Sequence, residues 1–344
     1  MIRSRSLATL VVAGFALVIA AYVALWYIEA SRIRAGIARF IEARAAHGMV
    51  IKSERLDIEG FPFRLDADFG RLTVDGLPYA KPAHIEAPSL VARARPWRPG
   101  DWRFVAARGF TLDLGLTGAM TTVLRAADAR GRADADAGDP GGLEISIDSH
   151  EVAFGAGAGV PSAHHASLRL TVPEKPPEDH TTPSLTFAAV VDRAELPSEI
   201  EPPDGLLDSL IVTGVVEGPM PEQPLVAALN AWREGGGAIE LRQVALRWGA
   251  VDLLGDGTLT LDANLQPAAA FTGRIRGWEA LLDDFVKAGT LTKDQASYYR
   301  LGLGLLTRVA DDGKNELRAP ITLQNTQVFL GPAKIAKVPL ITWQ

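Results

Sequence analysis

Four histidines lie close together in the chain and are the first candidates for metal binding. They are His150, His164, His165 and His180. Zinc sites that are recognisable from sequence pair their ligands at short, fixed spacings, and these histidines lack such a spacing. Adjacent side chains on a strand also point to opposite faces, so His164 and His165 would not share a ligand. The spacing therefore predicts no metal site.

Two other stretches contain fragments of binding motifs. The glycines of residues 155–159 imitate a nucleotide-binding loop, but the next glycine of that motif would fall at Val160, and no helix is expected to follow. The acidic residues of 134–138 imitate a calcium loop, but the glutamate that closes such a loop would fall at Ile145. We interpret both stretches as solvated turns.

The chain lacks the sequence signatures of the common enzymes. It contains no G-x-S-x-G elbow, no P-loop and no H-E-x-x-H zinc helix, and its cysteine count is zero. We therefore predict a protein that is not an enzyme and has no catalytic residues and no cofactor. The net charge of −6 also argues against nucleic acid as a partner, because phosphate binding requires a basic surface.

Apolar residues carry the remaining chemical signal, because they alternate with polar ones over most of the chain. This period of two predicts at least ten strands, each with one apolar face, in a largely antiparallel sheet. The alternation slips at Gly60 and again at Gly70, which predicts a bulge or tight bend at each. A wide sheet with one apolar face must cover that face with its own helices, another layer or a ligand. If the ligand is lipid, the candidate lining residues are Phe63, Leu65, Phe69, Leu112 and Leu114.

An uncharged run near the N-terminus predicts a membrane-spanning helix. Residues 7–28 carry no charged side chain, and at ~1.5 Å per residue they reach ~33 Å, enough for a hydrocarbon core of ~30 Å. The run is too long for the apolar region of a cleaved signal, and it ends in Trp26 and Tyr27, which favour the membrane interface. We therefore expect an uncleaved anchor with a cytoplasmic N-terminus at residues 1–6.

The helical spacing of apolar residues continues beyond the anchor and predicts a helical stalk over residues 29–48, ending at the stop signal Gly48. Residues 49–344 then form an extracytoplasmic β-rich domain, since long domains cross the membrane largely regardless of charge. At 47% hydrophobic and 22% charged residues, the chain has enough apolar side chains to form a sizeable core.

Three helices are predicted among the strands, over residues 224–234, over 277–288 and from Thr292 onwards, where Gln295 completes a capping-box spacing. The last two are expected to form a hairpin that packs on the sheet or closes its end. Two loops are predicted, at 126–142 and at 173–183, from their content of Ala, Asp, Gly and Pro.

Several short segments resemble an uncharacterised family of bacterial single-anchor envelope proteins, known as domain of unknown function 2125. They are Gly60-Phe61-Pro62-Phe63-Arg64-Leu65, Pro96-Trp97-Arg98-Pro99 and Leu330-Gly331-Pro332. The family name implies a location and a fold and carries no established activity. The architecture of one N-terminal span followed by a long amphipathic sheet is also similar, more distantly, to the AsmA-like proteins. That resemblance implies a curved sheet forming a lipid-conducting groove.

These observations combine into one expected architecture. The chain is mainly β, with an N-terminal transmembrane helix and stalk followed by a long curved antiparallel β-sheet, as a groove or open barrel, and a few packed helices. We expect it in the bacterial inner membrane with its main domain in the periplasm, where the sheet binds or passes lipid acyl chains. The alternative is a scaffold that buries this face in a solid core and binds another envelope protein.

Overall fold

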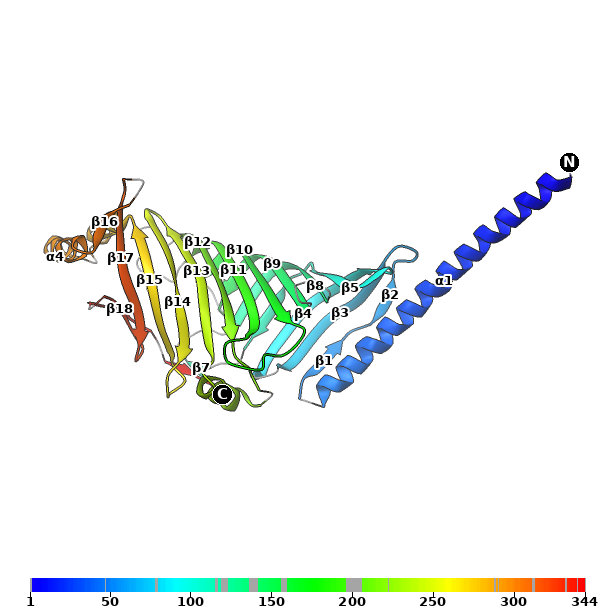
Figure 1. Cartoon of the computed structure of the whole chain (residues 1–344), viewed down its shortest axis with the longest axis horizontal. Helices are drawn as coiled ribbons and strands as arrows, with labels where there is room; N and C mark the ends of the chain where they lie inside the picture. Colours follow the sequence, from blue (N-terminus) through cyan, green and yellow to red (C-terminus); the bar gives the residue numbers. More distant parts are fainter. Residues whose placement is uncertain are drawn as a thin grey trace.

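The structure is a computed structural model, and it describes most of the chain. The described residues are 2–46, 48–77, 80–114, 117–118, 123–135, 142–155, 160–195, 206–221, 223–287, 289, 291–310, 313–331, 333–338 and 340–343. The body is one curved antiparallel sheet of 18 strands, and a long N-terminal helix runs beside its first strands and projects beyond them (Figure 1). The predicted fold class is confirmed, and the sheet is open rather than a closed barrel.

The helices are α1 (Ile2–Ala45), α2 (Leu225–Glu234), α3 (Trp278–Lys287) and α4 (Lys293–Gly304). The strands of the first half are β1 (Val50–Ser53), β2 (Asp57–Glu59), β3 (Leu65–Leu77), β4 (Ala80–Arg95), β5 (Arg98–Ala106), β6 (Phe110–Asp113), β7 (Thr117–Gly118), β8 (Val123–Asp134), β9 (Gly142–Phe154) and β10 (Ser162–Pro173). Those of the second half are β11 (Pro183–Glu195), β12 (Leu206–Glu217), β13 (Ala238–Trp248), β14 (Val251–Leu261), β15 (Pro267–Arg276), β16 (Thr307–Val309), β17 (Asn315–Gln324), β18 (Gln327–Leu330), β19 (Ala333–Lys337) and β20 (Ile341–Thr342).

The sheet is a meander in which strands that follow one another in sequence are mostly neighbours in space. From β8 to β15 each strand pairs antiparallel with the next, and β15 then pairs with β17 across the inserted hairpin of α3 and α4. At the other end, β3 pairs with β1, β2 and β4, and β5 and β6 both connect β4 to β8. Short turns explain the pairing of β13 with β14 and of β14 with β15, whereas β12 and β13 are joined through α2.

The predicted breaks in strand register are observed. Gly60 has φ +98° and Gly70 has φ +60°, in the region that side-chain-bearing residues rarely adopt. The pairing of β3 with β4 shifts on both sides of Gly70. These bends keep the apolar side chains of β3 on one face of the sheet, although the apolar residues change from odd-numbered to even-numbered positions along the strand.

All three helices predicted among the strands are present within one or two residues of their expected limits. The capping box at α4 is formed, because the Gln295 amide N–H donates to the Thr292 hydroxyl and the Gln295 side chain accepts from the Thr292 amide. An ion pair between Arg300 and Asp283 joins α4 to α3, as expected for a hairpin. The helix predicted beyond the anchor also continues, ending at Ala45 just before Gly48.

One loop prediction is wrong. Most of residues 126–142 is regular strand, since β8 runs to Asp134 and β9 begins at Gly142, while 136–141 lie outside the described residues. The cause is that β8 alternates charged residues with very small ones, so its inward positions are Ala and Gly, which give little hydrophobic signal. Pairing with β5, β6 and β9 on its two sides makes it a strand. The loop predicted at 173–183 is confirmed between β10 and β11.

The C-terminal strand β20 contacts two parts of the body that are far apart in the sequence. It pairs with β7, which lies between β6 and β8, and the side-chain amide of Gln266 exchanges two hydrogen bonds of 2.9 Å with the backbone of Ile341. The indole N–H of Trp343 donates to the carbonyl of Leu265 in the same turn between β14 and β15. The C-terminal strand β20 therefore links β7, in the first half of the chain, to the turn between β14 and β15 in the second half.

Candidate functional site

One face of the sheet is apolar from end to end. A row of directly opposed residues crosses from β3 to β17 without a polar side chain: Ala67, Ala92, Phe104, Gly131, Ile147, Leu168, Ala189, Val212, Val244, Gly255, Gly273 and Ala319. The adjacent row is equally apolar: Trp102, Ala133, Ile145, Leu170, Phe187, Gly214, Leu241, Gly257, Phe271, Ile321 and Leu330. Because side chains on a strand alternate between faces, both rows belong to one surface, which we call the apolar face.

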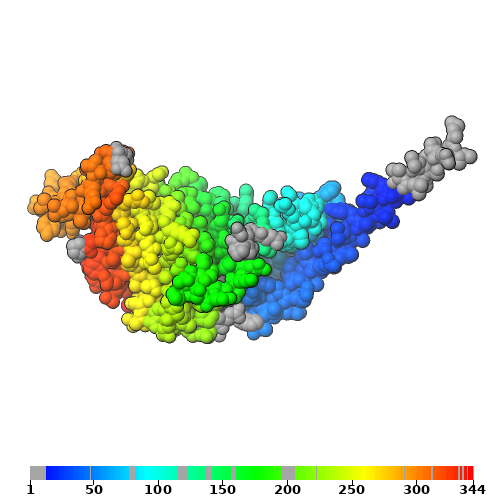
Figure 2. All heavy atoms as spheres, viewed as in Figure 1, coloured from blue at the N-terminus to red at the C-terminus, as the bar shows by residue number. Residues whose placement is uncertain are grey.

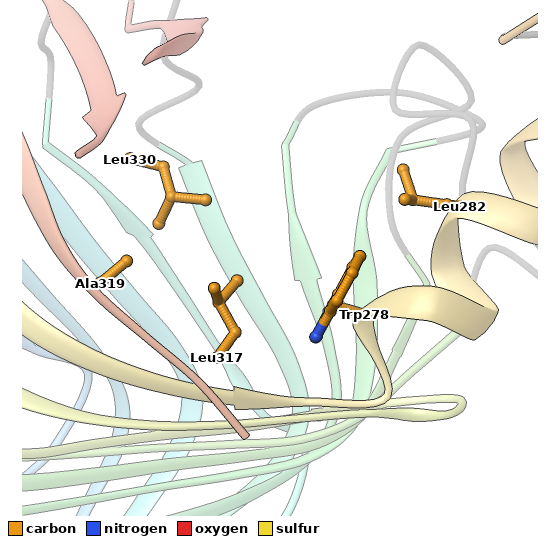
Figure 3. Packing of buried hydrophobic residues seen from close by; sticks show 5 residues of the cluster. All are labelled: Trp278, Leu282, Leu317, Ala319 and Leu330. Atoms are coloured by element: carbon orange, nitrogen blue, oxygen red, sulfur yellow. The ribbon is translucent and has the colours of Figure 1, made fainter. Parts of the chain in front are cut away.

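Figure 3 shows where this face lies at the far end of the sheet. Leu317, Ala319 and Leu330 are on the inner side of the curve, and Trp278 of α3 packs among them. The apolar face is thus the inner surface of the curved sheet, and α3 covers its C-terminal end. Trp278, Leu317 and Ala319 are all buried by this contact.

Over β4–β10 the opposite face is largely polar and charged, whereas farther along the sheet the apolar residues Val190, Ile211, Ala245 and Leu254 are opposed on it. Residues of neighbouring strands in one of its rows are Arg93, Arg103, Arg132, Ser146 and Arg169. Arg132 lies between two carboxylates, at 2.7 Å from Asp101 and 2.6 Å from Asp134. The hydrogen bond from Arg132 lowers the pKa of Asp101, because it stabilises the ionised carboxylate. In this part of the sheet the outer surface is therefore suited to water and the inner surface to an apolar layer.

The two ends of the apolar face are covered, and its middle is half-exposed. At the N-terminal end, Trp26 and Ala30 of α1 pack on Leu65 of β3. Between this contact and α3 most members of the two rows are only half-buried, and Leu168 on β10 is 36% exposed. A half-exposed apolar surface of this breadth on a folded protein is typical of a site for an apolar ligand or partner.

The five residues predicted to line a lipid groove are not gathered in one place. Leu65 is fully buried beneath α1, so it is part of the contact between helix and sheet. Leu112 is half-buried and is paired with two other apolar residues, Ile85 on β4 and Leu124 on β8.

The other three predicted residues lie elsewhere. Phe69 and Leu114 are half-buried, beside the bend of β3 and just after β6 respectively. Phe63 is 66% exposed in the turn between β2 and β3. Leu168 and the other half-buried members of the apolar rows were not predicted as lining residues, although they show the same alternation of apolar and polar residues. The sequence does not give the register between strands, which decides which of these residues are neighbours.

An aromatic cluster forms where α1 leaves the sheet. The indole N–H of Trp26 donates to the carbonyl of Arg64 at 2.8 Å, and the ring of Phe61 packs edge-on against Trp26 at 5.5 Å between centroids. Phe63 beside this cluster is exposed, and so is Trp97 in the neighbouring turn between β4 and β5. The pairing of Leu65 with Ala94 brings these two turns to the same edge of the sheet.

Among the described residues, the last hydrogen bond between α1 and the turn between β2 and β3 is donated by the Tyr22 hydroxyl to the carbonyl of Pro62. On the N-terminal side of Tyr22 the helix projects away from the body, as Figure 2 also shows for the residues that follow position 12. Phe15, Leu17 and Val18 are exposed on it, which suits a surrounding apolar medium. In the part of the chain that the structure describes, Ala13–Ala45 is the one helical segment long and apolar enough to cross a membrane. This composition indicates membrane association.

Among the known proteins compared with this chain, no curated protein and no solved structure matches. A family model does match, over residues 26–339. The matched region begins at Trp26, where α1 contacts the sheet, and ends after β19, so it includes the whole apolar face and both turns of the aromatic edge. The chain therefore belongs to the family described as an uncharacterized protein conserved in bacteria, DUF2125.

Proposed function

We propose that this is a membrane-anchored protein of the bacterial envelope that holds or passes lipid acyl chains along the inner face of its curved sheet. The observation that carries the proposal is the pair of uninterrupted apolar rows, half-exposed between the covers formed by α1 and α3. The proposed role requires no bond to be made or broken, so the protein acts as a carrier or a conduit and not as an enzyme.

The dimensions of the apolar face suit an extended hydrocarbon chain. Neighbouring strands are ~4.8 Å apart, so the row from Ala67 to Ala319 follows the curve for roughly 50 Å. This exceeds the ~30 Å hydrocarbon thickness of a whole bilayer, and hence the length of one acyl chain. Each methylene removed from water contributes about 0.8 kcal/mol, so contact along the row stabilises a bound acyl chain relative to the surrounding water.

The aromatic edge supports a position against the membrane surface. From Leu7 to Tyr27 the helix is ~30 Å long, which matches the hydrocarbon core and places Trp26 and Tyr27 at the interface. Phe61 packs on both of these rings. The exposed Phe63 would then lie at the depth that aromatic rings favour.

This arrangement gives the proposed lipid a route of entry. With the span in the inner membrane and the body in the periplasm, the edge formed by the β2–β3 and β4–β5 turns meets the outer surface of that membrane. A lipid would enter beside α1 and move along the apolar face. Four residues of the apolar face near this edge are buried: Leu65, Ala67, Ala92 and Ala94.

The test is site-specific photocrosslinking of the full-length protein in intact cells. A p-benzoylphenylalanine replaces Leu168 on the apolar face or, as the matched control, the exposed Thr186 on the outer face of the next strand. We expect a lipid-mass adduct on the peptide from position 168 and none from position 186. Adducts to another envelope protein at position 186 and none at position 168 would support the scaffold function instead. The absence of any lipid adduct at position 168 would overturn the lipid proposal.

A charge substitution provides a second test of the lipid proposal. Leu168→Glu places a carboxylate on the half-exposed inner surface, where it can remain hydrated in the absence of ligand, so folding should persist while lipid binding is lost. Thr186→Glu adds the same charge on the outer face. Native mass spectrometry of the two purified full-length variants should show co-purifying lipid with the second and not the first. Equal lipid content in both would refute the assignment of this face.

A further inference from the structure

Five titratable side chains meet on the outer face of the sheet, away from the apolar face. Asp128, His150, His165 and Asp192 are directly opposed on the consecutive strands β8, β9, β10 and β11. Asp148 lies two residues before His150 on β9 and therefore on the same face. The rings of His150 and His165 are 5.3 Å apart between centroids.

Each histidine uses its Nδ1 atom in a hydrogen bond to an outer carboxylate. His150 Nδ1 is 3.0 Å from Asp128 Oδ1, and His165 Nδ1 is 3.1 Å from Asp192 Oδ2. This leaves the Nε2 atoms for the middle of the cluster, where His165 Nε2 is 3.1 Å from Asp148 Oδ2. Histidines that bind metals are typically held in this way, with the second ring nitrogen donating to a carboxylate that fixes tautomer and orientation.

We propose that this cluster is a binding site for a divalent transition metal, with Zn²⁺ as the best-matched ion, held by Asp148, His150 and His165. One ligand atom from each of the three lies within 4.8 Å of the others. Zinc bonds of ~2.0–2.1 Å to nitrogen and oxygen place tetrahedral ligands about 3.3 Å apart, and the His165–Asp148 separation is already close to that value. Asp128 and Asp192 serve as the orienting carboxylates.

The charge balance of the site favours a cation. Three carboxylates face two imidazoles, and a divalent ion offsets most of that negative charge. The ligand types, one carboxylate and two imidazoles, are those of three-ligand zinc sites that leave a fourth position for water or another oxygen donor.

This site cannot be recognised from the spacing of residues in the sequence, because its ligands come from two strands. Asp148 and His150 have the i, i+2 spacing of one strand face, while His165 reaches them through the pairing of β9 with β10. The adjacent His164 instead contacts Glu151 at 2.7 Å, and it provides a matched control.

The test is Zn²⁺ titration of the metal-stripped full-length protein by calorimetry, with metal content measured after dialysis. We expect saturable binding of one Zn²⁺ per chain by the wild type and by His164→Ala. His165→Ala should weaken binding at least 100-fold, and Asp192→Asn should weaken it about 10- to 100-fold through loss of the orienting hydrogen bond. Circular dichroism of each variant confirms the fold.

Two results would overturn the site. One is a wild-type protein that shows no saturable Zn²⁺ binding. The other is a folded His165→Ala variant that binds Zn²⁺ as tightly as the wild type. Co²⁺ in place of Zn²⁺ gives a second measurement, since a tetrahedral site with nitrogen and oxygen ligands has visible absorption bands that His165→Ala should abolish.

Discussion

The contact between α1 and the sheet can be tested by Leu65→Ala. The Leu65 side chain is 0% exposed and packs against Trp26 and Ala30 of the helix. The substitution removes three apolar carbon groups, worth about 2.4 kcal/mol at ~0.8 kcal/mol each, and leaves a cavity that raises the total to about 3 kcal/mol. Because the site is closed between a rigid helix and a paired strand, we expect little relaxation into the cavity.

The measurement is thermal unfolding of the full-length protein in detergent, followed by circular dichroism. A loss of about 3 kcal/mol should lower Tm by roughly 5–10 °C in a body of this size. Leu301→Ala on the exposed face of α4 is the matched control and should change stability by less than ~0.5 kcal/mol. A Leu65→Ala variant that melts within 1 °C of the wild type would refute the reasoning, because it would mean that helix and sheet do not pack in the folded protein.

Three further outcomes are expected. Gly60→Val should destabilise the body by more than ~1 kcal/mol in the same melting assay, because the added Cβ would be held at φ +98° and 3.0 Å from the Cβ of Arg64; an unchanged Tm would contradict this. The two arginine partners of the buried Glu316 lower its pKa, so its stabilising effect is present above its unfolded pKa of ~4.3 and is lost as the pH falls. The wild-type Tm should therefore fall more steeply than that of Glu316→Gln below about pH 5, and parallel curves would exclude the effect. A reporter fused after Gln344 should behave as extracytoplasmic, whereas cytoplasmic activity would reverse the proposed orientation.

The sequence alone determined the elements and the character of each face. Alternation with a period of two is a local property, and it identified most strands and showed that each has one apolar side. Capping chemistry at Thr292 and Gln295 is equally local, and so is the positive φ that only glycine adopts easily at Gly60 and Gly70. Where the inward residues were Ala and Gly, as in β8, the same alternation was present but too weak in hydrophobicity to be recognised.

Only the tertiary structure decided which of these residues meet. Leu65 and Leu168 both lie in segments where apolar and polar residues alternate. In the structure Leu65 is buried beneath α1, whereas Leu168 is half-exposed between the parts of the sheet that α1 and α3 cover. His150 and His165 have no ligand spacing along the chain, and the pairing of β9 with β10 makes them neighbours. Register between strands and the docking of a helix are fixed by hydrogen bonds and packing between distant segments. A local pattern can therefore assign a side chain to a face, while its partners depend on how the whole sheet is aligned.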